Sequence, residues 1–408
     1  MAEHPWISSY PDGVRWDAVL PLMPVQQLLD DAVKRWPDRP VLEFLGRVIS
    51  YRELGELADR AGKGFQALGV GPGVHVGLFL PNSPHYPIAF FGVLKAGGTV
   101  VNYSPLDAER VLAHKIEDSE TDLLVTLDQA ALYPQIGRLL GASRLKKLIV
   151  GNLADYAGQP AAVHAHLQAT QQLVAVPQDD RHLRFDALLA NRGDFEPQAL
   201  GDLTQALVVL QYTGGTTGLP KGAMLTHANL SAACAQYQQP LLAAGSDVEA
   251  GNERVLVVLP LFHIYSLTVN MLLGLCLGAE LVLHPRFDVD AVLHDLAAKR
   301  ITFFAGVPTM YTAVLNHPKA GDTDLRALKF CGSGGAPLPV EVAEQFQELT
   351  GCPINEGWGM TETSPTGTFT PGARDAQAGL VRDAASRHRA QVPEPEPARR
   401  RRASGRAG

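Results

Sequence analysis

Short runs of apolar, mostly β-branched residues alternate along the chain with longer stretches whose apolar positions recur at helical spacing. Because strands that are apolar on both faces need helices over both faces, this alternation predicts an α/β fold with parallel sheets. Two series of strands predict two α/β lobes, separated by residues 151–200, which have few strand signals and look like an insertion or a connecting segment. Strands are expected at 74–80, 99–102 and 122–126, and then at 207–212, 254–259, 280–283, 302–305 and 328–331. Helices are expected at 107–118, 288–299 and 339–350.

The pattern of the lobes covers residues 1–372 and stops there. Residues 373–408 contain nine Arg and four acidic residues, with no Lys and no aromatic residue. The run PEPEPARRRR at 393–402 has no hydrophobic face to bury, so we predict a disordered Arg/Ala/Pro-rich tail. Arg runs also occur in segments that contact nucleic acid or anionic membranes. The abrupt change favours a solvated tail without a partner, or a non-native end of the reading frame.

Composition excludes several classes of protein. The chain has 408 residues, of which 46% are hydrophobic, so it can form a substantial core and is neither disordered throughout nor collagen-like. A net charge of −7 argues against a general nucleic-acid binder. The four Cys form no metal-ligand spacing, which favours a reducing compartment and a cytoplasmic location. Residues 255–279 are uncharged, but Pro260 and His263 interrupt them, so we expect a buried strand, a turn and a core helix rather than a membrane span.

The strongest chemical signal is the segment QYTGGTTGLPKG at 211–222, directly after an expected strand. Its glycines allow backbone N–H groups to turn inward, its threonines add hydroxyl donors, and Lys221 adds a positive charge, as a triphosphate requires. Lys221 is followed by Gly222, so this is not a Walker A loop. A Gly/Thr-rich linker is the alternative, and the helix-start signal at 226–229 argues against it. The predicted phosphate-binding residues are Thr213, Gly214, Gly215, Thr216, Thr217 and Gly218.

This segment resembles the phosphate loop of the AMP-forming adenylate ligases, which include acyl-CoA synthetases, luciferases and peptide-synthetase adenylation domains. Three further segments match in the family's order: PLFH at 260–263 resembles the substrate-gating motif, GSGGAPL at 332–338 the adenine-side loop, and NEGWGMTET at 355–363 the nucleotide and magnesium motif. Four ordered matches over residues 20–372 are specific. The resemblance implies the large domain of an adenylate-forming enzyme.

The resemblance also implies roles for individual residues. Glu362 would hold Mg²⁺ together with Thr213, Thr361 would bond the α-phosphate, Lys221 would neutralise phosphate charge, and His263 would contact the carboxylate or control its entry. Glu362 as a surface glutamate and His263 as a core or capping histidine remain the alternatives. The nucleotide would also contact Gly335, Ala336, Pro337, Glu356, Gly357, Trp358, Gly359 and Thr361. Trp358 would present an aromatic face to adenine; a buried core tryptophan is its alternative.

The closest resemblance is to bacterial long-chain fatty acid–CoA ligases, which implies ATP, Mg²⁺ and coenzyme A as cofactors and co-substrate. The expected partners are small molecules and not nucleic acid; peripheral contact with the inner membrane and a homodimer are left open. The family's small C-terminal domain has no counterpart after residues 370–372, so we expect that domain to be missing and turnover by this chain alone to be weak. A non-catalytic nucleotide-binding remnant, and a ligase for aryl or medium-chain acids, are the competing hypotheses.

Overall fold

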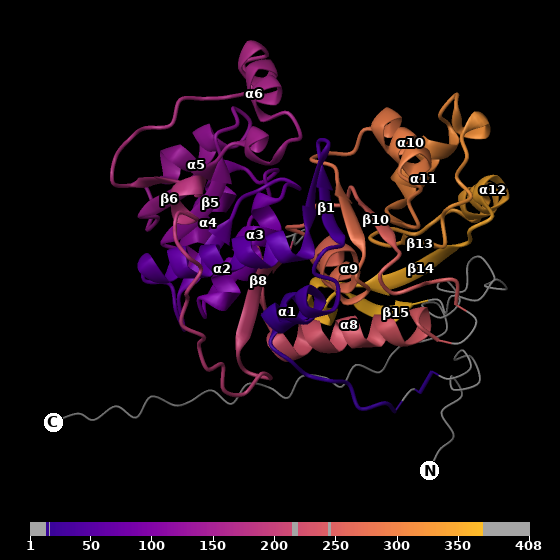
Figure 1. The fold of residues 1–408 in the computed structure, drawn as a ribbon, viewed down its shortest axis with the longest axis horizontal. Helices are drawn as coiled ribbons and strands as arrows, with labels where there is room; N and C mark the ends of the chain where they lie inside the picture. The colour runs from indigo at the N-terminus through magenta and orange to yellow at the C-terminus, as the bar shows by residue number, and fades with distance from the viewer. Residues whose placement is uncertain (1–13, 16, 214–218, 244–245, 370–408) are drawn as a thin grey trace, which may run out of the picture.

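The computed structural model describes residues 14–15, 17–213, 219–243 and 246–369. Two α/β lobes lie side by side, the first in indigo and magenta and the second in orange and yellow (Figure 1). The predicted tail at 373–408 lies outside the described residues. The α/β class and the two-lobe architecture predicted from the sequence are therefore confirmed.

The first lobe is built on a seven-stranded sheet. Its order is β7 (His182–Arg184), β6 (Lys147–Gly151), β5 (Leu123–Leu127), β3 (His75–Leu78), β4 (Thr99–Asn102), β8 (Leu207–Thr213) and β9 (Lys221–Thr226). The helices of this part of the chain are α1 (Val25–Arg35), α2 (Tyr51–Ala67), α3 (His85–Lys95), α4 (Glu109–Asp118), α5 (Tyr133–Leu139), η2 (Leu153–Tyr156), α6 (Pro160–Ala169) and α7 (Phe185–Leu188). Every residue of α3 is buried.

The second lobe is built on an eight-stranded sheet. Its order is β15 (Thr366–Phe369), β14 (Ile354–Gly359), β13 (Phe330–Ser333), β12 (Phe303–Gly306), β10 (Arg254–Val257), β11 (Glu280–Leu283), β1 (Pro40–Phe44) and β2 (Arg47–Ser50). The helices are α8 (His227–Leu241), the π-helix η3 (Ser266–Leu272), α9 (Leu273–Cys276), α10 (Val289–Ala298), α11 (Pro308–Leu315), η4 (Ala320–Asp322), α12 (Val340–Thr350) and η5 (Thr361–Thr363).

The prediction of purely parallel sheets is wrong at the sheet edges. Strand β2 runs antiparallel to β1, β9 to β8, and β15 to β14. Two residues, Leu45 and Gly46, join β1 to β2, and both have positive φ angles, of 47° and 80°. That is the backbone of the tight two-residue hairpin turn whose twist suits antiparallel strands. The internal strands of each sheet remain parallel, as their apolar runs predict.

The lobes are not two consecutive stretches of sequence, which is a second correction. Strand β8, expected to begin the second series, pairs with β4 of the first sheet, whereas the N-terminal strand β1 pairs with β11 of the second. Residues 151–200 are more than a connecting segment, because they supply the edge strand β7. The largest apolar core runs through both lobes and includes residues of both sheets. The two lobes therefore pack as one body.

Helix α8 begins where the sequence signal places it. The Thr226 hydroxyl accepts a hydrogen bond from the backbone N–H of Asn229 at 3.2 Å, and the Asn229 side chain accepts one from the N–H of Thr226 at 2.9 Å. This capping box satisfies N–H groups that the first helical turn leaves unpaired. Residues 255–279 form the buried strand β10, a turn and the buried helices η3 and α9, as predicted. Within the described part of the chain, no helix is both long and apolar enough to cross a membrane.

Candidate active site

The phosphate-loop segment leaves the first sheet at the carboxyl end of β8. Thr213 is the last residue of β8 and pairs across the antiparallel ladder with Lys221, the first residue of β9. The Thr213 hydroxyl donates to the Lys221 carbonyl at 3.4 Å, and the Lys221 side chain is exposed. Lys221 was expected inside a loop, but it begins a strand that the sequence analysis missed. Gly214, Gly215, Thr216, Thr217 and Gly218 lie outside the described residues.

The short helix η5 brings the proposed metal ligand to this hairpin. It follows β14 of the second sheet, yet it packs against β8 and β9 of the first. Thr361 is half-buried and Glu362 is exposed. Two backbone hydrogen bonds fix this turn: Met360 N–H donates to the Pro365 carbonyl at 2.9 Å, and Ser364 N–H donates to the Thr361 carbonyl at 3.2 Å. Thr361 and Glu362 thus lie beside the strands that carry Thr213 and Lys221.

The predicted adenine-side residues lie after β13 and along β14. Gly335, Ala336 and Pro337 are exposed in the loop after β13. The Glu356 carboxylate accepts a hydrogen bond from the Leu338 N–H at 3.1 Å, which fastens this loop to β14. Among the other β14 residues, Gly357 is half-buried and Gly359 is exposed.

Trp358 is not a buried core residue, because 51% of its surface is exposed. Its ring packs against the neighbouring strand β15, where a Cβ added to Gly367 would lie 2.2 Å from the Trp358 Cζ3 atom. Only glycine leaves room for the ring at that position. The indole therefore lies at the surface of the second lobe, close to the η5 turn, where a flat ligand can reach it.

His263 ends the PLFH segment, which follows the parallel strand β10. Its Nδ1 accepts a hydrogen bond from the Tyr265 N–H at 3.3 Å, so in the neutral ring the proton is on Nε2. Desolvation by the surrounding protein lowers the pKa of His263 below its usual value, although the residue is exposed at the surface. A neutral imidazole with an N–H donor directed away from its own backbone can bond an oxygen of a carboxylate.

The donor set suits a magnesium ion that arrives with a nucleotide. Among the described residues there is no group of three or more His, Cys, Asp and Glu side chains that could hold a metal by itself. Mg²⁺ keeps most of its waters and binds through one or two carboxylates plus phosphate oxygens. The exposed Glu362 carboxylate meets that requirement.

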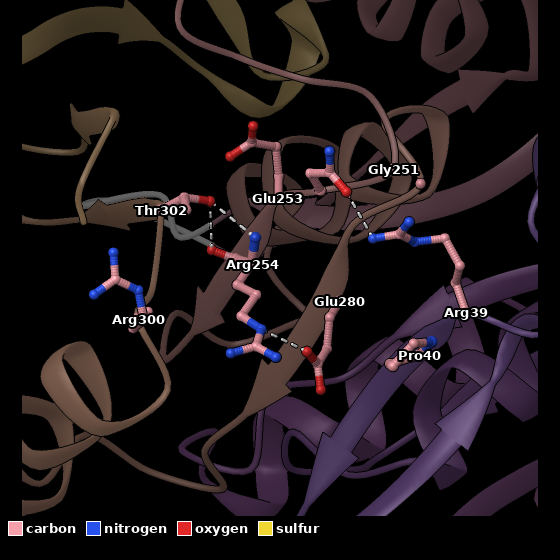
Figure 2. Close-up of a pocket in the computed structure, with 10 residues that line it drawn as sticks. Arg39, Pro40, Gly251, Glu253, Arg254, Glu280, Arg300 and Thr302 are labelled. Atoms are coloured by element: carbon pink, nitrogen blue, oxygen red, sulfur yellow. Dashed lines mark hydrogen bonds and ion pairs between the residues drawn. The ribbon is translucent and has the colours of Figure 1, made fainter.

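A cavity of about 310 Å³ lies elsewhere, at the amino ends of β10, β11 and β12 (Figure 2). Its polar residues are mostly paired with one another. Arg254 Nε contacts Glu280 Oε2 at 2.8 Å, Thr302 Oγ1 accepts from the Arg254 N–H at 2.8 Å, and Arg39 donates to Asn252 at 2.9 Å. Ligands of open parallel sheets bind at the carboxyl ends of the strands, so this cavity is separate from the candidate site.

Sequence reasoning missed three buried amides at the carboxyl edge of the first sheet: Asn82, Asn102 and Gln211. They bond to one another or to the segment after β10. The only sequence signal for Asn82 and Asn102 was their position after, or at the end of, an expected strand. Gln211 begins the QYTGGTTGLPKG segment, but no role was predicted for it. The partners that join Asn82 and Gln211 to the second lobe lie more than 50 residues away along the chain; Gln211 and Phe262 are 51 residues apart.

Residues 29–392 match the family model described as "AMP-binding enzyme". The chain therefore belongs to the family of AMP-binding enzymes, and the resemblance inferred from the four segments is confirmed. The matched residues extend past 372 into the Arg/Ala/Pro-rich segment.

Among curated relatives, a long-chain-fatty-acid–CoA ligase of Bacillus subtilis is 34% identical over 378 residues, which are 89% of this chain and 64% of the relative. A long-chain-fatty-acid–CoA ligase of Escherichia coli O6:H1 is 32% identical, covering 92% of this chain and 67% of its own length. A feruloyl-CoA synthase of Amycolatopsis is 32% identical, covering 81% and 57%. The chain thus spans about two thirds of the length of the fatty-acid ligases it matches.

Solved structures show the same fold. An anthranilate CoA ligase in complex with anthranoyl-AMP superposes with a TM-score of 0.75 at 23% identity, covering 89% of this chain and 64% of that one. A long-chain-fatty-acid-CoA ligase from Archaeoglobus fulgidus gives a TM-score of 0.72 at 22% identity, covering 89% and 68%. At these identities the structural similarity supports the fold of the large domain but not a particular substrate or activity.

Proposed function

We propose that the chain binds Mg-ATP and a carboxylic acid between its two lobes and activates the acid as an acyl-adenylate for transfer to coenzyme A. The observation that carries this proposal is the packing of η5 against β8 and β9. It brings a carboxylate from one lobe to the Gly/Thr-rich hairpin of the other. A site assembled from both lobes is suited to holding a triphosphate and its metal together.

In the proposed reaction an oxygen of the acid attacks the α-phosphorus, the bond to pyrophosphate breaks, and coenzyme A then displaces AMP. Little covalent chemistry is asked of the protein; it positions the reactants and stabilises the charge on the phosphate oxygens. Lys221 and the Thr213 hydroxyl would contact phosphate oxygens at the end of β8. Mg²⁺, when bound, would neutralise phosphate charge, with Glu362 as its protein ligand and Thr361 beside it.

His263 would position the acid. Its Nε2–H can donate to one carboxylate oxygen while the other oxygen attacks phosphorus. The lowered pKa keeps the ring neutral near pH 7, so it would orient the carboxylate without forming an ion pair that weakens the nucleophile. In this role His263 must lie at a fixed distance from the end of β8, where the nucleotide would bind.

We propose a long-chain fatty acid as the acid. The support is the similarity to the fatty-acid ligases of Bacillus and Escherichia, together with helix η3, which follows His263, is buried throughout and has four apolar residues among its seven. The feruloyl-CoA synthase among the relatives makes an aryl acid the second candidate.

Acid-dependent exchange of labelled pyrophosphate into ATP tests the proposal, with hexadecanoate, octanoate and ferulate as separate substrates. We expect exchange to require an acid and to be fastest with hexadecanoate. Faster exchange with ferulate would favour the aryl candidate. Nucleotide binding without exchange for any acid would contradict the ligase proposal and favour a nucleotide-binding protein that does not catalyse the reaction.

A further inference from the structure

Three buried side-chain amides line the carboxyl edge of the first sheet, each from a different neighbouring strand. Asn82 follows β3, Asn102 ends β4 and Gln211 lies near the end of β8; they are 3%, 2% and 4% exposed. All three lie where the first lobe meets the segment that leaves β10 of the second. We call residues 258–263, from the end of β10 to His263, the exit segment.

Asn82 holds the start of the exit segment through its backbone. The Asn82 amide nitrogen donates to the carbonyls of Val257 and Leu259 at 3.1 and 3.0 Å. Its amide oxygen accepts from the Leu261 N–H at 2.8 Å. The Asn82 side chain thus links the first lobe to three backbone groups of the second.

Gln211 holds the end of the exit segment. Its amide nitrogen donates to the Phe262 carbonyl at 2.8 Å, and its amide oxygen accepts from Asn102 Nδ2 at 2.9 Å. Tyr86 donates to Asn102 Oδ1 at 2.9 Å. Because the Tyr86 hydroxyl occupies the oxygen of Asn102, the amide nitrogen of Asn102 is left to face Gln211. This chain of bonds directs the Gln211 N–H₂ group to Phe262.

We propose that Gln211 is a positioning residue that couples the nucleotide site to the acid site. This inference rests on the proposed function. Gln211 stands two residues before Thr213 in the same strand, and its partner Phe262 directly precedes His263. A shift at the end of β8 on nucleotide binding would break the bond to the half-buried Phe262 carbonyl unless the exit segment moves with it. Losing this partly buried hydrogen bond is unfavourable, so the two ends move together.

The test is a thermodynamic cycle on the whole 408-residue chain. The dissociation constant of magnesium α,β-methylene-ATP is measured by calorimetry with and without saturating hexadecanoate, and the ratio is the coupling factor. Gln211→Met keeps the length and volume of the side chain and removes both hydrogen bonds. Gln211→Asn keeps the amide but is one methylene shorter, so it serves if the Met variant is unfolded. Gln238→Met is the matched control, because Gln238 also donates to a backbone carbonyl, that of Cys276 at 3.2 Å.

We expect hexadecanoate to change the nucleotide affinity of the unaltered chain at least about fivefold, within the usual range of coupling between sites. In both Gln211 variants the factor should fall to less than about twofold, while Gln238→Met keeps it. Equal coupling factors in the unaltered chain and the Gln211 variants would overturn the inference and leave the proposed function standing. An unaltered chain that binds neither probe would overturn both, and one that binds both without coupling would overturn the inference alone.

Discussion

The amino edge of the second sheet differs from the carboxyl edge where β8 and β9 of the first sheet meet η5 of the second lobe, because the charged residues of the two regions have different partners. At the amino edge, Arg254, Glu280 and Thr302 bond to one another around the cavity of Figure 2. At the carboxyl edge, the described structure shows no ion pair between Lys221 or Glu362 and another described residue. Charged groups that satisfy each other internally contribute to stability, whereas charged groups exposed beside a glycine-rich segment are available to a ligand. The cavity therefore has the paired charges of a structural region, whereas the candidate site has charges that a ligand can contact.

Replacing the charge at the carboxyl edge should have the largest effect. We expect Lys221→Met to reduce acid-dependent pyrophosphate exchange about 10²–10³-fold, the usual loss when a donor to developing charge is removed. Its melting temperature should not change, because the Lys221 side chain is exposed. Lys319→Met, which removes another exposed lysine, is the control and should retain exchange. Equal losses in both variants would show that net charge alone matters.

A buried histidine away from both edges should make the chain acid-sensitive. His227 Nδ1 accepts from the Val25 N–H at 3.0 Å, and burial lowers the pKa of His227 to about 4. Between about pH 6.5 and 4 the unfolded chain therefore binds the proton and the folded chain does not, so stability falls as pH decreases through this range. The loss should reach on the order of 2–3 kcal/mol by pH 4, since each pKa unit corresponds to about 1.4 kcal/mol.

Urea unfolding at several pH values measures this effect. In His227→Gln, whose amide oxygen can still accept from Val25, the decline below pH 6.5 should be smaller than in the unaltered chain. His166→Gln removes an exposed histidine and should leave the decline unchanged. Identical pH profiles for His227→Gln and the unaltered chain would show that other groups cause the acid sensitivity.

Disrupting the amino edge should have the smallest effect, and only on stability. Arg254→Met removes the contact with Glu280 and a hydrogen bond from Nη1 to the Lys299 carbonyl at 2.6 Å. Because the Arg254 side chain is 43% exposed, solvent screens the pair, and we expect a loss of about 1 kcal/mol in unfolding free energy. Nucleotide affinity should be unchanged. A loss of affinity comparable to that of Lys221→Met would mean that the two edges are not functionally distinct.

The sequence predicted those parts of the fold that local pattern determines. Strands β4 and β11 have the predicted limits of 99–102 and 280–283, because both are short apolar runs buried on both faces. Strand β9 was missed, since KGAMLT alternates weakly and β9 is the edge strand of the first sheet. The pairing of β1 with β11 could not be predicted, because it joins residues about 240 positions apart and no local pattern records the partner.

The candidate site also has residues that the sequence predicted and residues that it did not. Ordered motifs predicted Thr213, Lys221, His263 and Glu362, because ligands constrain short segments of sequence. Asn82 lies in none of these motifs, and Gln211 begins one that assigned it no role. Both bond to backbone carbonyls of the other lobe, as Asn82 does to Leu259, 177 residues away. Contacts of this kind become visible only once the lobes are folded together.

The most direct test of the central claim, that η5 supplies a magnesium ligand beside the β8–β9 hairpin, is calorimetry on Glu362→Gln with two nucleotides. Mg-ATP needs the metal ligand, whereas AMP measured without metal does not. We predict that Mg-ATP affinity falls at least about tenfold while AMP affinity stays within about twofold, and that Glu348→Gln, an exposed carboxylate on α12, changes neither. Equal losses for Mg-ATP and AMP in Glu362→Gln, or no loss for either, would contradict the account.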